Sequence, residues 1–249
     1  MSEPALPPSP SHTPSSTTAE AAAGPVLRLA SAADLPAIAR CWYEGFFDDE
    51  VIGEIMHPRR SQFPEDVYWF LLRGIRERFW DYRHQFVVVV VREQDGQDRV
   101  VGAADWRRLG EGGQARELWA MDPRNLVAPA LHLYHQTCLR VWPNRAADPN
   151  RKSFLSSAVE DSKRFWTGER AECWDLHVCG VHPKYQRRGI GKLLVRWGVQ
   201  RAEEEGACAS VICGAKNRGF YASGGLTELA GKPGTGEGGG IVLFTESKK

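Results

Sequence analysis

The sequence predicts an α/β (α+β) fold in which helices flank a sheet, and three observations support this class. Two apolar segments, 85–92 and 99–107, are separated by the turn dipeptide Asp95-Gly96, which indicates a β-hairpin. A third apolar segment, 174–181, ends at a turn that leads into a helix. The apolar residues of this helix recur at i, i+3, i+4 and i+7, the spacing of one buried face: Ile190, Leu193, Leu194 and Trp197.

The N-terminal half begins with a tail and continues with two amphipathic helices. Residues 1–24 are rich in Pro, Ser, Thr and Ala, which predicts a disordered tail, and residues 25–249 are expected to form one domain. The first strand is expected at Val26–Leu29, and Asp34 is expected to cap the first helix. A second helix is expected to begin near Pro64, because proline and acidic residues favour a first helical turn.

The C-terminal part predicts a sheet that continues after the main helix. A strand is expected at 210–213, a short helix at 217–222, and two further strands at 226–230 and 241–245. The last of these is expected to close the sheet.

The bulk properties are those of a soluble globular protein. The 249 residues carry a formal net charge of +1, and this balance predicts no nucleic-acid or membrane partner. The longest apolar run, 86–91, is too short to span a bilayer, and the N-terminus lacks the pattern of a secretory signal. We therefore expect a cytoplasmic protein. The six cysteines show no Cys-x-x-Cys spacing, which favours free thiols in a reducing compartment.

A glycine-rich turn before the main helix has the composition of an anion-binding site. Glycines at a helix start leave the first backbone N–H groups accessible, and the helix dipole adds positive potential there. Two arginines and a lysine surround the turn, so a phosphate-bearing cofactor is one explanation and a solvated turn is the other. The candidate phosphate-binding residues are Gln186, Arg187, Arg188, Gly189, Ile190, Gly191 and Lys192.

Two motifs in this order resemble those of the GNAT family of N-acetyltransferases. The first is Gln-x-x-Gly-x-Gly at 186–191, preceded by Val181-His182-Pro183 and a strand. The second, at 219–226, resembles the family's Phe-Tyr-x-x-x-Gly-Phe motif, with Gly225-Leu226 in place of Gly-Phe. The resemblance is direct over 170–230 and looser over 26–108. It implies a central mixed, mostly antiparallel twisted sheet flanked by helices, and an enzyme that binds acetyl-CoA.

The resemblance also implies how the cofactor is held. In the family, the strand before the turn pairs with the pantetheine arm of CoA, and by position Cys179, Gly180 and Val181 do so here. Gly180 is expected where the family's strand bulges and splays. Asn217 is a further candidate for cofactor contact.

Three residues are candidates for the chemistry of acetyl transfer. Asp175 and His177 lie two residues apart on one strand, so both are expected on one face, where family members place a base. Either is expected to serve as base or proton relay, although each has a structural alternative: an ion pair for Asp175 and a core position for His177. Tyr221 matches the family's tyrosine that protonates or hydrogen-bonds the departing sulfur.

No metal site is expected. His132 and His135 have helical i, i+3 spacing, but the sequence places no acid or cysteine near them to complete a site.

The connection at 110–170 exceeds that of the compact family core. Two helix-like runs, 125–141 and 153–166, predict a helical insertion between the third and fourth strands. The insertion either shapes an acceptor pocket or lid, or buries the sheet edge. Three functions stay open: an acetyl-CoA-dependent N-acetyltransferase acting on a small amine, a protein lysine or N-terminal acetyltransferase, and a non-catalytic acyl-CoA sensor or scaffold. The chain is expected to be a monomer or a homodimer.

Overall fold

The structure is a computed structural model that describes residues 24–93, 96–114, 122–151, 153–233 and 240–246. The predicted tail therefore lies outside the described residues except for Gly24, and so does most of the connection between the last two strands.

Within these ranges, seven strands form one sheet in the order β1-β2-β3-β4-β5-β7-β6. Only β4 and β5 run parallel, and every other neighbouring pair is antiparallel. The predicted mixed, mostly antiparallel sheet is confirmed. The strands are β1 (Val26–Leu29), β2 (His84–Arg92), β3 (Asp98–Leu109), β4 (Cys173–Val181), β5 (Cys208–Gly214), β6 (Glu228–Gly231) and β7 (Gly240–Phe244).

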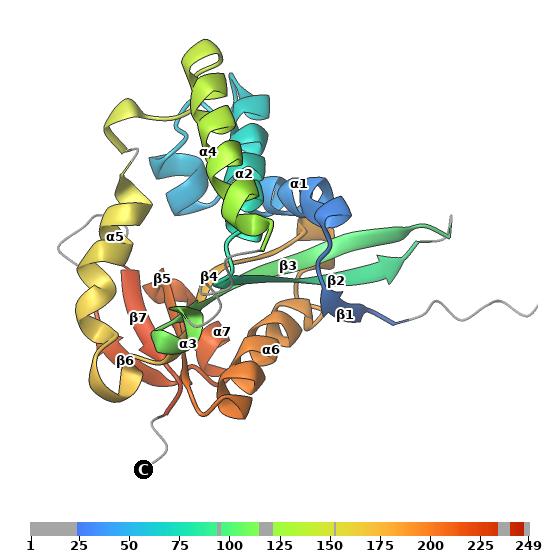
Figure 1. The fold of residues 1–249 in the computed structure, drawn as a ribbon. Coiled ribbons are helices and arrows are strands. Elements are labelled where there is room, and N and C mark those ends of the chain that lie inside the picture. The colour runs from blue at the N-terminus through green and yellow to red at the C-terminus, as the bar shows by residue number, and fades with distance from the viewer. Residues whose placement is uncertain (1–23, 94–95, 115–121, 152, 234–239, 247–249) are drawn as a thin grey trace, which may run out of the picture.

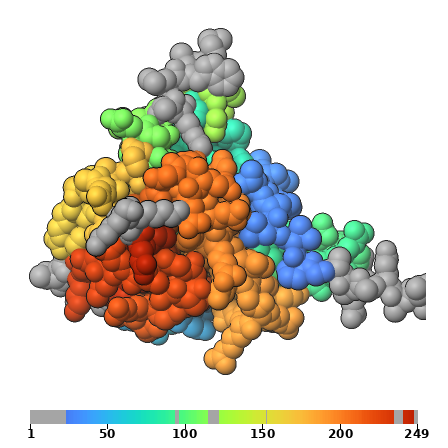
Figure 2. Space-filling view, turned by 90° about the horizontal axis from the view of Figure 1, so that it is seen from below, coloured from blue at the N-terminus to red at the C-terminus, as the bar shows by residue number. Residues whose placement is uncertain are grey.

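Helices cover both faces of this sheet (Figure 1). One face packs against α6, and the other packs against α1 and α2. Figure 2 shows α6 in orange, beside the red C-terminal segment and the blue N-terminal one. The α-helices are α1 (Leu35–Phe46), α2 (Pro64–Phe79), α3 (Glu111–Gln114), α4 (Arg124–Val141), α5 (Phe154–Ser162), α6 (Ile190–Glu204) and α7 (Arg218–Ala222).

The valine run of β2 supplies both cores because side chains alternate across a strand. Val87 and Val89 pack with Leu194 of α6, while Val88 and Val90 pack toward α1 and α2. Both faces of β2 are thus buried, as the sequence predicted.

Two details of the helices differ from prediction. Asp34 is the N-cap residue of α1 as expected, but its carboxylate makes no capping hydrogen bond to α1 and instead accepts one from the Ser31 backbone N–H at 2.7 Å. Leu193 was expected on the buried face of α6, yet it is 41% exposed. The buried face of α6 is shifted by one position relative to the predicted one. Val195 and Gly198 are buried, and Gly198 packs against the ring of Trp106.

The helical insertion between β3 and β4 is confirmed, with α4 packed against α2 (Figure 1). The Glu77 carboxylate of α2 lies 3.0 Å from His135 Nδ1 and 3.5 Å from His132 Nδ1 of α4. The expectation that no acid lies near these histidines was wrong, because the acid comes from a helix about sixty residues away in the sequence. The pair of histidines fastens the insertion to α2.

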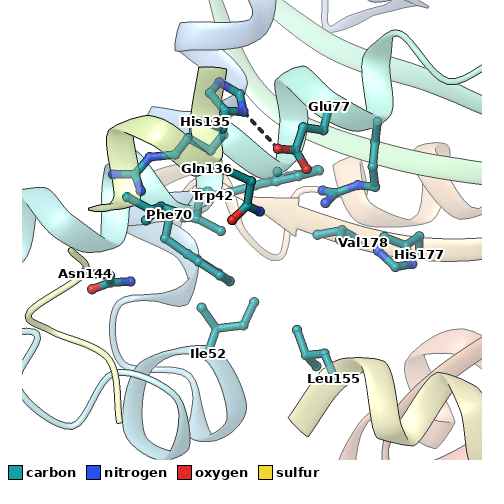
Figure 3. A pocket seen from close by; sticks show the side chains of 15 residues that line it. Trp42, Ile52, Phe70, Glu77, His135, Gln136, Asn144, Leu155, His177 and Val178 are labelled. Atoms are coloured by element: carbon teal, nitrogen blue, oxygen red, sulfur yellow. Dashed lines mark hydrogen bonds and ion pairs between the residues drawn. The ribbon is translucent and has the colours of Figure 1, made fainter. Parts of the chain in front are cut away.

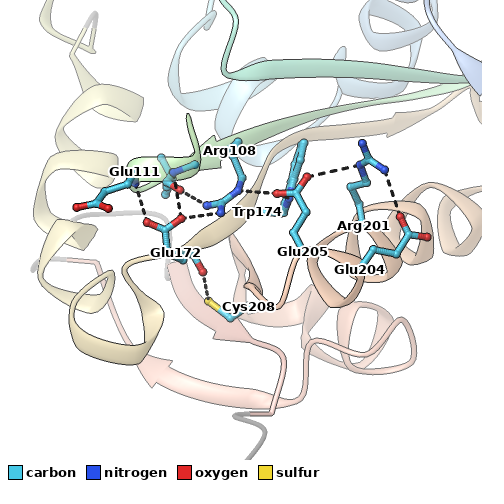
Figure 4. Close-up of polar contacts among 10 residues, drawn as sticks. Arg108, Glu111, Glu172, Trp174, Arg201, Glu204, Glu205 and Cys208 are labelled. Carbon is cyan, nitrogen blue, oxygen red and sulfur yellow. Dashed lines mark hydrogen bonds and ion pairs between the residues drawn. The ribbon is translucent and has the colours of Figure 1, made fainter. Parts of the chain in front are cut away.

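An ion-pair network joins the insertion side of the sheet to α6 (Figure 4). Arg108 of β3 is buried and binds Glu172 at 2.6 Å and Glu205, just after α6, at 2.9 Å. The Trp174 indole donates to the same Glu205 carboxylate at 3.0 Å. These contacts fix the C-terminal end of α6 against β3 and β4.

Two further observations bear on the bulk properties. All six cysteines are free thiols. In the part of the chain that the structure describes, no helix has both the length and the apolar character needed to cross a membrane.

Candidate active site

Strands β4 and β5 part halfway along their length, which opens the sheet beside the glycine-rich turn. Their pairing runs from Cys173–Cys208 to Leu176–Val211 and stops there. Beyond that point β4 stays on β3 as far as Val181, whereas β5 stays on β7 as far as Gly214. Over 177–181, the edge of β4 that faces β5 therefore has no strand neighbour among the described residues.

A β-bulge lies where the two strands separate. Asp105 of β3 pairs with Val178 and Trp106 pairs with Leu176, so His177 is the extra residue. The expected position of the bulge, Gly180, was wrong. Gly180 has a different reason to be glycine: a Cβ there would lie 2.6 Å from Trp42 Cδ1, so the residue lets α1 approach the strand.

The turn before α6 presents backbone donors to solvent. Gly189 adopts a left-handed conformation (φ 82°) directly before α6, and Arg187 also has a positive φ of 61°. The N–H groups of Ile190, Gly191 and Lys192 have no hydrogen-bond acceptor within the described ranges. Arg187 and Arg188 are exposed beside them. Free N–H groups, the helix dipole and two guanidinium groups together fit a diphosphate.

The other cofactor candidates surround this turn in different ways. Gln186 braces it, because its side-chain amide donates to the Val181 carbonyl at 3.1 Å. Gly191 lets α7 come close, since a Cβ there would meet the Phe220 ring at 2.9 Å. Cys179 packs on the α6 side of the sheet. Asn217 is the residue before α7 and is exposed.

Tyr221 of α7 reaches the place where the strands separate. Its pKa is raised well above the usual value, because the side chain is largely removed from water, although part of its surface stays accessible, and it lies near Cys179 of β4 and Cys213 of β5. The phenol is therefore protonated at neutral pH. Its hydroxyl makes no hydrogen bond to any residue that the structure describes.

Tyr221 is firmly held although the sequence departs from the family's second motif. Leu226, which stands where the motif has phenylalanine, is fully buried, and its N–H donates to the Tyr221 carbonyl at 3.1 Å. Gly224 packs on α6, where a Cβ would meet Val195 Cγ1 at 2.5 Å. The smaller residues allow a one-turn helix to sit close to α6.

Asp175 lies inside the paired part of the sheet rather than at the opening. One carboxylate oxygen accepts a hydrogen bond from Ser210 Oγ at 2.9 Å, and the other accepts one from Arg107 Nη2 at 3.2 Å. Burial raises the pKa of this carboxyl, although Arg107 and Ser210 oppose the shift. Both oxygens are thus engaged in structural contacts.

His177 lies at the opening and on the same face of the sheet. Its ring meets the ring of His84 edge-on, with centroids 5.7 Å apart, and His84 is the cross-strand partner of Arg107. Burial, reinforced by the nearby Arg78 guanidinium, lowers the pKa of His177 to about 3. The imidazole is neutral at neutral pH.

A buried carboxylate beside this histidine was missed from the sequence. Asp105 is fully buried and binds Arg78 Nε at 2.6 Å and His84 Nδ1 at 2.7 Å. Burial alone would raise its pKa, but the two basic groups outweigh burial and hold the pKa well below the usual value. The available signal was a single acidic residue in the apolar strand run 100–106.

A pocket of about 260 Å³ opens onto β4 at His177 and Val178 (Figure 3). Helices α1, α2, α4 and α5 contribute to it, so the insertion forms part of its wall. Apolar and polar side chains contribute equally to the lining. The lining residues are Trp42, Ile52, Phe70, Leu71, Arg73, Gly74, Glu77, Arg78, His135, Gln136, Leu139, Asn144, Leu155, His177 and Val178.

The neutral state of His177 predicts a pH dependence of stability. Below about pH 6.5 the unfolded chain binds a proton at this histidine and the folded chain does not, so the free energy of unfolding falls with decreasing pH. The contribution approaches about 1.4 kcal/mol per pH unit. Urea unfolding between pH 7 and 5 should show a shallower slope for His177→Asn than for the native chain. His132→Asn, at an exposed side chain, is the control that keeps the native slope.

Comparison with known proteins bears on the family of the chain. The sequence pattern described as "Acetyltransferase (GNAT) family" matches residues 49–225. An acetyltransferase of Stachybotrys chartarum is 27% identical over 186 residues, covering 75% of this chain and 73% of that protein.

Two solved structures resemble this chain at low sequence identity, and the first of them shares its fold. One is named "histone acetyltransferase HPA2 and related acetyltransferase", from Corynebacterium glutamicum; it has a TM-score of 0.56 at 15% identity, covering 90% of this chain and 97% of that one. A polyamine N-acetyltransferase of Drosophila melanogaster has a TM-score of 0.49 at 16% identity, covering 89% and 99%. The family pattern spans more than half of the sequence, and the chain belongs to the GNAT family of acetyltransferases.

Proposed function

We propose that this protein transfers an acetyl group from acetyl-CoA to the amine of a small molecule while both substrates are bound. The observation that carries the proposal is the protonated Tyr221 hydroxyl at the opening between β4 and β5, which has no hydrogen-bond partner among the residues described. A pocket of about 260 Å³ reaches the same stretch of β4 from the other side of the sheet. A proton donor and an acceptor pocket thus meet at one strand.

Separate parts of the chain would hold the cofactor. The free N–H groups of Ile190, Gly191 and Lys192, with Arg187 and Arg188, would bind the diphosphate. The unpaired edge of β4 over 177–181 would hydrogen-bond the pantetheine amides. Acetyl-CoA supplies the thioester that is cleaved.

The residues at the opening would manage two protons. As the acceptor nitrogen bonds to the acetyl carbon and the carbon–sulfur bond breaks, Tyr221 donates its proton to the departing sulfur. The acceptor amine must lose a proton to water, and the neutral His177 can accept a hydrogen bond from the amine and orient it. Asp175 would position β4, because Ser210 and Arg107 occupy both of its oxygens.

The pocket favours a small acceptor over a protein segment. Leu155 of α5 and His135 of α4 both line the pocket and lie on opposite sides of it in Figure 3, so the insertion encloses part of the space beside β4. The test is thiol release from acetyl-CoA with a panel of small amines and with lysine peptides. Peptide turnover exceeding that of every small amine would refute the assignment, and cofactor binding without any transfer would favour a non-catalytic role.

Removing the two arginines of the turn should weaken cofactor binding. For Arg187→Ala/Arg188→Ala we expect the dissociation constant of acetyl-CoA to rise roughly tenfold or more, because charge-assisted contacts to the diphosphate are lost. Turnover at saturating acetyl-CoA should change little. Calorimetry measures the affinity, with Arg196→Ala, an exposed arginine farther along α6, as the control. Unchanged affinity in the double variant would mean that the turn does not bind the diphosphate.

A further inference from the structure

One cation in the acceptor pocket has no role in the proposed transfer. Arg73 lies on α2 and lines the pocket, yet it forms no ion pair or hydrogen bond with any residue in the described ranges. Burial lowers its pKa, but a guanidinium remains charged at neutral pH. A partly desolvated, unpaired cation is costly unless a ligand supplies the opposite charge.

The other charged groups of the pocket already have partners. Arg78 binds the buried Asp105 carboxylate at 2.6 Å. Glu77 binds His135 Nδ1 at 3.0 Å, so its negative charge is directed toward α4. The carboxylates of Asp66 and Glu77 act on Arg73 only from a distance, so Arg73 is the charged group of the lining without a direct partner among the described residues.

A second polar group near Arg73 also lacks a partner. His135 is 2% exposed, and its Nε2 has no hydrogen-bond partner among the residues described. His135 and Arg73 both line the pocket, and the two helices that carry them pack together. An anionic group bound there would satisfy the guanidinium of Arg73.

The positions along α2 separate this cation from the site of transfer. Arg78 faces Asp105 at the β4 end of the pocket, close to His177. Arg73 lies five residues earlier, about 7.5 Å along the helix axis. Figure 3 shows His177 and Val178 on one side of the pocket and Asn144 on the other, with Phe70 and Trp42 between them. The side chains that line the intervening space are thus the apolar Phe70 and Trp42, together with the uncharged Gln136.

We propose that the acceptor is an amine that also carries a carboxylate, joined to it through an apolar body, and that Arg73 binds this carboxylate. The inference rests on the proposed function and narrows its substrate class. The same positive charge disfavours diamines and polyamines, because a second ammonium group would face the unpaired guanidinium.

Three ligands that share one ring test this assignment: 4-(aminomethyl)benzoate, benzylamine and 1,4-bis(aminomethyl)benzene. The ring position opposite the aminomethyl group carries a carboxylate in the first ligand, a hydrogen atom in the second and another aminomethyl group in the third. This position is therefore anionic, uncharged or cationic. We expect kcat/KM to be about tenfold or more higher for the benzoate than for benzylamine, and lowest for the diamine. The difference should appear mainly in KM, because Arg73 contacts the part of the acceptor that does not react.

Substitution of the arginine should abolish the preference. In Arg73→Gln the benzoate and benzylamine should react equally well, and in Arg73→Glu the order should reverse in favour of the diamine. Arg76→Gln, three residues farther along α2 and outside the pocket lining, should keep the native order. A benzoate preference that survives in Arg73→Gln, or is absent from the native protein, overturns the inference.

Ligand binding distinguishes this failure from failure of the proposed function. Calorimetry with the three ligands and CoA requires no transfer. Binding of the benzoate that depends on Arg73, without acetylation of any of the three, would leave the ligand class standing and refute the transferase proposal. Acetylation of benzylamine or the diamine in preference to the benzoate would refute the ligand class and leave the transferase proposal standing. If none of the three binds or reacts, the carboxylate assignment is wrong.

Discussion

Replacing Tyr221 with phenylalanine should reduce turnover about 100- to 1,000-fold and leave acetyl-CoA affinity nearly unchanged. The substitution removes only the hydroxyl, while the ring keeps its packing against α6 and the sheet. A positioned proton donor typically contributes a factor in this range. Burial keeps the phenol protonated, so the hydroxyl is the form that donates the proton at neutral pH. Phenylalanine has no group that could replace it in this role.

The measurement is kcat at saturating concentrations of both substrates, with acetyl-CoA affinity determined separately by calorimetry. Tyr43→Phe is the matched control, because Tyr43 lies on α1 and its ring contacts Phe47 and Tyr68 rather than the strand opening. A native kcat in Tyr221→Phe would remove this residue from the mechanism.

Replacing Asp105 with asparagine should lower the free energy of unfolding by about 3 kcal/mol. Removing one member of a buried ion pair leaves its partner charge without compensation, which typically costs 3–5 kcal/mol. Asp105 is fully buried and is shared by Arg78 and His84, so asparagine would keep the shape of the side chain and lose both charge-assisted contacts.

Urea unfolding at pH 7 measures this loss. Asp66→Asn is the control, since Asp66 pairs with Arg145 at 2.9 Å, where the arginine side chain is 58% exposed. Exposed pairs contribute about 1 kcal/mol or less. Equal losses in the two variants would show that burial of Asp105 does not set the strength of its contacts.

Local sequence patterns were sufficient for the elements that hold the cofactor candidates. The hairpin of β2 and β3 follows from two apolar runs around a turn, and the β4–turn–α6 unit follows from an apolar strand, two glycines and a helical repeat. Each depends on neighbours within about ten residues. The bulge at His177 could not be predicted from the sequence. The alternation of side chains between the two faces of a strand does not show where one strand gains an extra residue.

The acceptor pocket could not be predicted from local patterns, because its residues lie far apart in the sequence. Arg73, His135 and His177 come together from α2, α4 and β4, which are separated by tens of residues and carry no shared motif. The insertion was recognised as helical, but its packing against α2 depends on contacts such as Glu77–His135. The role of Glu77 becomes visible only when the two helices lie side by side.

Different segments of the chain carry the proposed binding sites for the acetyl donor and for the acceptor amine. Residues 177–192 contain the strand edge and turn proposed for the donor, whereas the far wall of the pocket comes from α2 and from the insertion. The Arg108 contacts anchor the far end of α6 independently of that wall (Figure 4). Under the proposed function, substitutions in α4 and α5 can therefore change which amine is accepted while the donor machinery is inherited unaltered, so that new specificities arise without rebuilding the enzyme.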